Sequence, residues 1–91
     1  LGALLDARPN PFNCLTDIRY QITDDSQEYG LEIYDIAGRL VRNLSGQSSV
    51  IGYQLSVYWD GTDRSGASLP PGVYFVRLQG EVPSIKLVKL K

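Results

Sequence analysis

Residues 59–66 read WDGTDRSG and residues 72–78 read GVYFVRL, and these two stretches decide the fold. Asp63 and Gly66 stand at the first and fourth positions of a β-turn, where Asp caps backbone N–H groups and Gly adopts a positive φ. The residues before this turn alternate between apolar and polar up to Trp59, and those of the second stretch alternate in the same way. A period of two between turn signals predicts half-buried β-strands, with Trp59 directed towards the core.

The same signals recur earlier in the chain. Residues 16–23 alternate strictly, and residues 31–36 lead into a second turn of the same type, with Asp35 first and Gly38 fourth. Residues 39–44 then provide the return strand of a hairpin. Short strands with turn signals every 8 to 12 residues or so, and no helical period, predict an all-β antiparallel sandwich of about seven strands.

The chain has 91 residues, which allows one domain and is too short to enclose a large active-site cavity. Residues 1–8 are expected to form a linker or a first short strand, and residues 9–91 the domain itself. Residues 9–13 read PNPFN, and the two prolines preclude a helix there, while Phe12 is expected to anchor the segment in the core. We expect the chain to be the C-terminal module of a longer protein.

The net charge of −1 hides an uneven distribution. Residues 1–85 carry six arginines against ten carboxylates, whereas Lys86, Lys89 and Lys91, the three lysines, all lie in the last six residues. Binding to nucleic acid would require a basic face that replaces several phosphate counterions, so we expect no nucleic-acid partner. No apolar run approaches the roughly 18 residues of a membrane-spanning helix.

Residues 85–91 are expected to form the closing strand. The pattern does not fix which side of this strand is apolar, because Ile85 and Leu87 alternate with Val88 and Leu90. The lysines of this strand have two compatible explanations. They could protect an exposed sheet edge from pairing with another chain, or they could be read by a binding partner.

The sequence offers no catalytic, cofactor or metal site, and we expect no enzyme activity. The absence of histidine excludes Ser-His-Asp and Cys-His catalysis, and Cys14, the single cysteine, is expected to be a small buried hydrophobic residue. Asp60 and Asp63 are a candidate carboxylate pair, but capping of turn N–H groups explains both. Weak calcium binding at these two residues stays open, although the loop lacks the ligand spacing of a calcium-binding loop.

Aromatic residues of the second half suggest a second interpretation, a platform on which sugars stack. Trp59 is in phase with Val57 and is therefore expected in the core, whereas Tyr58 and Phe75 remain candidates for a surface role. A carbohydrate-binding or spacer module of a secreted hydrolase is thus an alternative. The aromatic residues concerned are Tyr53, Tyr58, Trp59, Tyr74 and Phe75.

Six motifs, taken in their order and spacing, resemble a known family over residues 9–91. The family is the type A C-terminal sorting domain of the type IX (Por) secretion system, and its second half is similar to the immunoglobulin-like domain of the flagellar hook-capping protein. The motifs are Pro9-Asn10-Pro11-Phe12-Asn13, Ile18 with Tyr20, Ile33-Tyr34-Asp35 with Gly38-Arg39 and Val41, Trp59-Asp60-Gly61 with Asp63 and Gly66, Gly72-Val73-Tyr74, and Lys86-Leu87-Val88.

The resemblance implies an immunoglobulin-like β-sandwich that serves as a sorting signal, without catalysis or cofactor. It would direct an exported parent protein through the periplasm of a Gram-negative bacterium to the cell surface or the medium. The implied partners are outer-membrane components of the type IX translocon, a sortase-like peptidase that removes the signal, and a cargo domain linked covalently on the N-terminal side. A structural domain of the flagellar hook-cap type is a further alternative.

The resemblance also assigns roles to the motifs. The segment 9–13 marks the start of the domain, and Gly38, Arg39 and residues 59–66 belong to hairpins and core. The basic end of the chain is the implied recognition site, where pairing of main chains at the strand edge would give affinity. The implied recognition residues are Lys86, Leu87, Val88, Lys89 and Lys91.

Overall fold

The chain folds into two antiparallel sheets that pack face to face. The computed structural model describes residues 2–22, 30–44, 49–51, 54–78 and 84–91. Eight strands lie in this part of the chain: β1 (Gly2–Arg8), β2 (Thr16–Ile22), β3 (Leu31–Asp35), β4 (Leu40–Asn43), β5 (Ser49–Ile51), β6 (Gln54–Trp59), β7 (Gly72–Leu78) and β8 (Ser84–Lys89).

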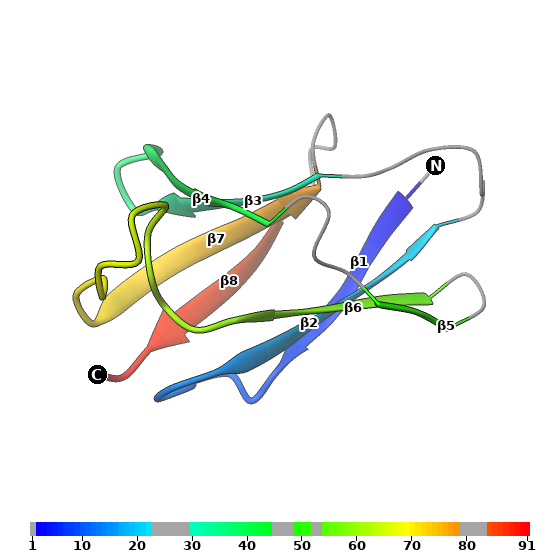
Figure 1. Cartoon of the computed structure of the whole chain (residues 1–91), viewed down its shortest axis with the longest axis horizontal. Helices are drawn as coiled ribbons and strands as arrows, with labels where there is room; N and C mark the ends of the chain where they lie inside the picture. Colours follow the sequence, from blue (N-terminus) through cyan, green and yellow to red (C-terminus); the bar gives the residue numbers. More distant parts are fainter. Residues whose placement is uncertain (1, 23–29, 45–48, 52–53, 79–83) are drawn as a thin grey trace.

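The strands form two four-stranded sheets, in the orders β1-β2-β6-β5 and β4-β3-β7-β8 (Figure 1). All strand pairs are antiparallel. The prediction of an all-β, immunoglobulin-like antiparallel sandwich is therefore confirmed. The structure has eight strands where about seven were expected, and the shortest is the three-residue β5, which pairs with β6.

The alternating residues face the core as the sequence predicts. Ile18 and Tyr20 of β2, Val57 and Trp59 of β6, and Val76 of β7 are all buried. Within each strand, the buried residues are two positions apart, which places their side chains on one face of the sheet. Burial of these large apolar side chains between the sheets is the main stabilising contribution to such a fold.

Three aromatic rings meet at the centre of the core. The ring of Trp59 lies 5.5 Å from the ring of Phe12 and 5.5 Å from that of Tyr74, centroid to centroid. Both polar groups are satisfied: Trp59 Nε1 donates to the Thr62 carbonyl (3.0 Å), and the Tyr74 hydroxyl donates to the Pro70 carbonyl (2.5 Å). A tyrosine near the start of a strand that bonds to backbone a few residues upstream is a hallmark of immunoglobulin-like folds. The expected core positions of Phe12 and Trp59 are confirmed.

Residues Gly2–Arg8, where the sequence left open a linker or a first short strand, form β1. This strand pairs with β2, and its residue Ala7 is buried in the core. Tyr53, one of the aromatic residues considered for sugar stacking, lies outside the described residues. In the described part of the chain, no helix is long and apolar enough to cross a membrane.

The register between β7 and β8 fixes the inner side of the last strand, which the sequence pattern left undecided. Leu87 lies opposite Tyr74, and Ile85 lies opposite Val76. Since directly opposed residues share one face of a sheet, Ile85 and Leu87 face the core. The alternation then directs Lys89 inwards as well, and its exposed fraction is 4%.

Candidate functional site

Strand β8, which carries the implied recognition residues, lies at the edge of its sheet. Its outer edge is covered by the segment that contains Asn10 and Phe12. The side-chain amide of Asn10 donates to the Lys86 carbonyl (2.7 Å) and accepts from the Val88 N–H (3.0 Å). One side chain thereby takes the place of a neighbouring strand at this point of the edge.

The backbone of Phe12 continues this cover along β8. Its N–H donates to the Val88 carbonyl (2.9 Å), and its carbonyl accepts from the Leu90 N–H (2.9 Å). The peptide bonds before Pro9 and Pro11 are both cis. The Lys86 carbonyl, both main-chain groups of Val88 and the Leu90 N–H are therefore bonded within the domain, and these groups are not available for main-chain pairing with a partner.

The structure divides the implied recognition residues into two groups. Leu87 and Lys89 are buried, with exposed fractions of 0% and 4%, so their side chains are not available to a receptor. Lys86 and Lys91 are exposed, and Val88 is half-buried. Of the five implied recognition residues, Lys86, Val88 and Lys91 are thus accessible, and their recognition by a partner stays a prediction.

Lys89 has a structural role that the sequence did not reveal. Its aliphatic chain lies against Gly61, where a β-carbon would stand 2.5 Å from Lys89 Cε and 3.7 Å from Phe12 Cε2. Its ammonium donates to the carbonyl of Lys91. An inward-directed charge on an edge strand is also one of the devices that prevent edge-to-edge pairing. The signal in the sequence was that Lys89 lies two positions after Leu87 and so shares its side of the strand. Only the register with β7 shows that this side faces the core.

The first D-x-x-G turn joins β3 to β4 and is closed by its aspartate. The Asp35 carboxylate accepts from the N–H groups of Ala37 (3.0 Å) and Arg39 (2.9 Å) and from Arg39 Nε (3.1 Å). The Gly38 N–H donates to the Asp35 carbonyl (2.9 Å), and Gly38 has φ 84°. The backbone hydrogen bond from Arg39 is the first cause that lowers the pKa of the Asp35 carboxyl below its ordinary value.

The second turn repeats this geometry at Asp63. Its carboxylate accepts from the N–H groups of Ser65 (2.9 Å) and Ala67 (3.0 Å), and also from the Ser65 hydroxyl (2.7 Å). Gly66 has φ 88° and donates its N–H to the Asp63 carbonyl (3.0 Å). The Ser65 hydroxyl and the Ala67 N–H are the main causes that lower the pKa of the Asp63 carboxyl. The predicted turns and the capping roles of both aspartates are confirmed.

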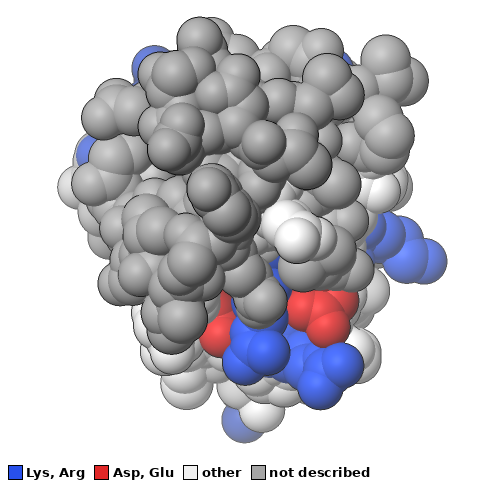
Figure 2. Space-filling model, turned by 90° about the vertical axis from the view of Figure 1, so that its right-hand side faces the viewer, with Lys and Arg blue, Asp and Glu red and all other residues white. Residues whose placement is uncertain are grey.

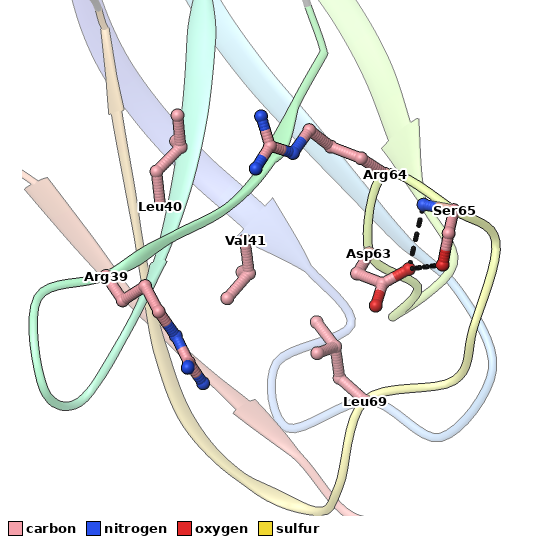
Figure 3. Close-up of a pocket in the computed structure, with 7 residues that line it drawn as sticks. All are labelled: Arg39, Leu40, Val41, Asp63, Arg64, Ser65 and Leu69. Carbon is pink, nitrogen blue, oxygen red and sulfur yellow. Dashed lines mark hydrogen bonds between the residues drawn. The ribbon is translucent and has the colours of Figure 1, made fainter.

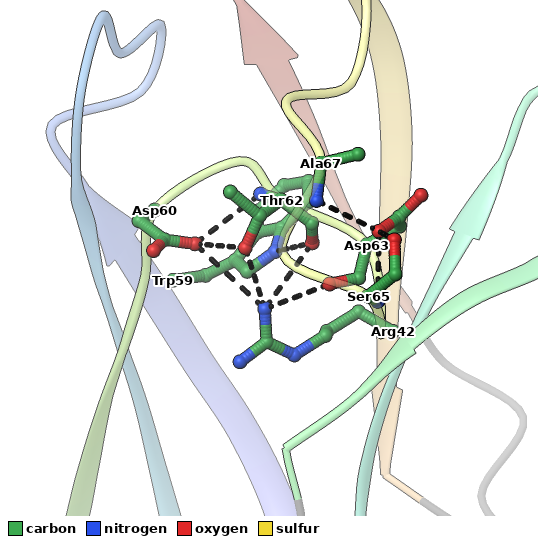
Figure 4. A network of polar contacts seen from close by, with 7 residues as sticks. All are labelled: Arg42, Trp59, Asp60, Thr62, Asp63, Ser65 and Ala67. Carbon is green, nitrogen blue, oxygen red and sulfur yellow. Dashed lines mark hydrogen bonds and ion pairs between the residues drawn. The ribbon is translucent and has the colours of Figure 1, made fainter.

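A network around Arg42 fastens the second turn to β4 (Figure 4). Its guanidinium donates to the Thr62 hydroxyl (2.6 Å) and to the Asp63 carbonyl (3.2 Å). The Thr62 hydroxyl in turn donates to the Asp60 carboxylate (2.5 Å), and this bond is the first cause that lowers the pKa of Asp60. Arg42 also lies 3.8 Å from Asp60.

The Arg42 guanidinium disfavours binding of a cation at Asp60 and Asp63, because it places a positive charge beside them. Among the described residues, no three His, Cys, Asp or Glu side chains lie close enough together to hold a metal ion.

A groove of ≈ 410 Å³ lies between β4 and the second turn (Figure 3). Arg39 contributes to it from the end of the first turn, and Arg64 and Ser65 contribute from the second. The Arg39 side chain is ion-paired with Asp35. The lining residues are Arg39, Leu40, Val41, Asp63, Arg64, Ser65 and Leu69.

The two aromatic residues with an expected surface role lie on different sheets. Tyr58 of β6 is 60% exposed, and Phe75 of β7 is half-buried. They do not form one row, whereas Trp59 and Tyr74 are in the core. Cys14 is exposed, so the expectation that it is buried is wrong.

Acidic partners accompany the arginines of β1 and β2. Arg8 pairs with Asp6 (2.9 Å), and Arg19 pairs with Asp17 (3.2 Å). On the face shown in Figure 2, basic and acidic side chains of the described residues lie next to one another at the lower centre. The surface charge in this part of the chain is therefore mixed in sign.

Comparison with known proteins gives a family match and similarity to solved structures. The family described as "FlgD Ig-like domain" matches residues 15–83. The crystal structure of dimeric latent PorU from Porphyromonas gingivalis is similar with a TM-score of 0.79 and 23% identity over 99% of this chain. The similar region is 9% of the PorU chain, and at this identity the likeness shows the fold alone. No curated protein matches the sequence.

Proposed function

The chain belongs to the family of FlgD Ig-like domains, and from this premise we propose that it is a non-catalytic sorting module. It directs an exported parent protein through the type IX secretion system to the cell surface or the medium of a Gram-negative bacterium. Its parent carries the cargo domain on the N-terminal side. The small share of the PorU chain that the similar region occupies supports a module of this kind within a longer protein.

The contact between the two ends of the domain carries this proposal. The family match covers residues 15–83 and leaves out both the PNPFN segment and β8. Both parts carry motifs of the resemblance to sorting domains. The structure joins them directly, since Asn10 and Phe12 bond to the backbone of β8 from Lys86 to Leu90. The first and the last motif of the resemblance thus lie together in the folded domain, which supports the proposal.

The mechanism that follows is recognition of a folded surface. Outer-membrane translocon components bind exposed side chains of the domain, because the main-chain edge of β8 is covered. A sortase-like peptidase then removes the module by cleaving the connection to the cargo. No group of the domain takes part in chemistry in this scheme, and the module requires no cofactor or metal.

A fusion experiment tests the proposal. A reporter with a signal peptide is expressed with and without the domain in a host that has a type IX system. We expect the fusion at the cell surface and the bare reporter in the periplasm. A fusion that carries the core variant Trp59→Ala controls for folding and should remain in the periplasm. Equal delivery of the reporter with and without the domain would contradict the sorting function.

The family match favours one other function, a structural domain of the flagellar hook-cap type. In that case the domain would take part in assembly of the hook and not in export of a cargo. Deletion of the domain from its parent gene separates the two functions. Loss of hooks and motility, with unchanged export, supports the hook-cap function, whereas retention of the parent in the periplasm supports sorting.

A further inference from the structure

The outer face of the β4-β3-β7-β8 sheet carries a row of aromatic and aliphatic side chains. The register places Tyr34, Phe75 and Lys86 side by side across three strands. Since Ile33, Val76 and Leu87 face the core, these neighbours face outwards. Val73 and Val88 are opposed in the next outward row and are both half-buried.

A shallow groove of ≈ 300 Å³ lies on this face. Tyr34 and Phe75 line it, and Ile36 lies at its border with an exposed fraction of 76%. The Arg77 guanidinium is 4.6 Å from the centre of the Tyr34 ring and donates to the Tyr34 hydroxyl (2.7 Å). Arg77 therefore holds the Tyr34 ring in place and contributes to a preformed surface.

The outer face of the other sheet differs. Asp17 pairs with Arg19 and accepts from the Ser56 hydroxyl, so the described part of this face is polar. Tyr58 lies opposite Asp17, and it has no aromatic neighbour across the strand. Of the two outer faces, only that of the β4-β3-β7-β8 sheet combines adjacent aromatic and aliphatic side chains in its described part.

The charges on the apolar face are paired with one exception. Arg77 lies 3.7 Å from Glu32 and is compensated by it. Within the part of the chain that the structure describes, the ammonium of Lys86 has no ion pair or hydrogen bond. The backbone at Lys86 is fixed by Asn10, and its neighbour in the row is Phe75. Among the described residues, Lys86 is thus an unpaired positive charge at the end of the row that Tyr34 and Phe75 form.

We propose that this face, around Tyr34, Phe75 and Lys86, is the surface that the secretion receptor binds. The receptor presents an apolar patch with a carboxylate opposite Lys86, since apolar anchors with a complementary charge at the rim are typical of protein interfaces. This proposal rests on the sorting function proposed above. The proposal does not include all three lysines as contacts of the receptor, because the Lys89 side chain is buried and contributes only to the fold.

The experiment compares matched variants in the reporter fusion. Phe75→Ser and Lys86→Glu change the proposed face, and Lys86→Arg retains its charge. Tyr58→Ser and Arg64→Glu are the controls, because they remove an exposed aromatic ring and reverse an exposed charge elsewhere. Thermal unfolding of each purified domain reports whether the variant is folded.

We expect Phe75→Ser and Lys86→Glu each to reduce the surface-to-periplasm ratio of the reporter by about tenfold or more, as for residues that dominate an interface. The two controls and Lys86→Arg should remain within about twofold of the wild type. If Phe75→Ser fails to fold, Lys86→Glu and Lys86→Arg decide the outcome, since an exposed lysine is not needed for the core.

Two other outcomes would overturn the proposal. Normal delivery of folded Lys86→Glu and Phe75→Ser fusions would show that the face is not read, while sorting itself stands. Failure of the wild-type fusion to reach the surface would instead contradict the sorting function. Analytical ultracentrifugation provides a further check: a wild-type dimer that Phe75→Ser dissociates would assign the face to a second copy of the chain.

Discussion

The Lys89 side chain lies against Gly61, where a β-carbon would stand 2.5 Å from Lys89 Cε and overlap it. Gly61 has φ 78°, a conformation that L side chains rarely adopt. The contact joins the loop after Trp59 to β8. Lys89 is thus buried against the loop that contains Gly61, a residue 28 positions earlier in the sequence.

This contact predicts that Gly61→Ala is more destabilising than Gly38→Ala. Both glycines have positive φ, so both substitutions introduce backbone strain of about 1–2 kcal/mol. Nothing lies within 4 Å of a β-carbon at Gly38, whereas one at Gly61 would overlap Lys89. We expect an additional loss of about 1–3 kcal/mol for Gly61→Ala from overpacking. Urea unfolding measures both values.

The double variant Gly61→Ala with Lys89→Ala tests the cause of that difference. Shortening Lys89 removes the overlap, so part of the additional loss should be recovered in the double-mutant cycle. Additive effects of the two substitutions would show that the two residues do not interact.

Trp59→Ala should destabilise the domain by about 3–5 kcal/mol, because it removes a large side chain that is fully buried between Phe12 and Tyr74. Such a loss is a large part of the stability of a small domain. The neighbouring Tyr58 is 60% exposed, and Tyr58→Ala should change the stability by only about 0.5 kcal/mol. Similar melting temperatures for the two variants would contradict the assigned core.

Asn10→Ala should open the edge of β8. The variant loses both side-chain hydrogen bonds to β8. Its free energy of unfolding should fall by about 0.5–1.5 kcal/mol for each lost hydrogen bond. Hydrogen exchange of the Val88 amide is the direct measurement and should become faster. Asn13→Ala, an exposed change in the same segment, is the control.

Asn10→Asp separates the two bonds. A carboxylate still accepts from the Val88 N–H but cannot donate to the Lys86 carbonyl. The Val88 amide should therefore stay protected while stability falls. Unchanged exchange of Val88 in Asn10→Ala would show that the cover does not depend on this side chain.

The aspartates of the turns predict how stability depends on pH. The pKa values of Asp35, Asp60 and Asp63 are lowered from the ordinary 3.8 by hydrogen bonds to the carboxylates. A lowered pKa in the folded state means stabilisation that is present above the unfolded pKa and is lost as the pH falls through the folded pKa. Stability should thus decline below a pH of about 4.

Asp63→Asn provides the test of this pH dependence. It removes one titrating group while retaining an oxygen that accepts hydrogen bonds, so the slope of stability against pH below about 4 should be smaller than in the wild type. An unchanged slope, measured by urea unfolding at a series of pH values, would mean that Asp63 does not titrate as assigned.

The sequence predicted the strands and turns because their signals are local. Alternation identified the core role of Trp59, and the D-x-x-G pattern identified positive φ at Gly38 and Gly66. These features depend on the chemistry of neighbouring residues, which a single sequence displays. The all-β sandwich follows from them without knowledge of the strand order.

Contacts between distant residues were not predictable in this way. Lys89 was expected to be accessible as one of the implied recognition residues, and only the register of β8 with β7 shows that its side chain faces inwards. The cover of β8 by Asn10 depends on a partner 78 positions away along the chain. Cys14 was expected in the core from its residue type, but it lies in an exposed stretch after Phe12. Residue type gave the wrong location for Cys14 because tertiary packing overrides it.

The hydrogen bonds of Asn10 and Phe12 to the edge of β8 bear on the order in which the domain folds. Asn10 and Val88 meet only after nearly the whole length of the described chain has been brought together, and contacts of such high sequence separation close late because of their loop entropy. Until they form, β8 has an unsatisfied edge on which other chains can add. The edge of β8 is therefore covered only in the fully folded domain. A receptor that binds only the domain with this edge covered would exclude incompletely folded protein from export.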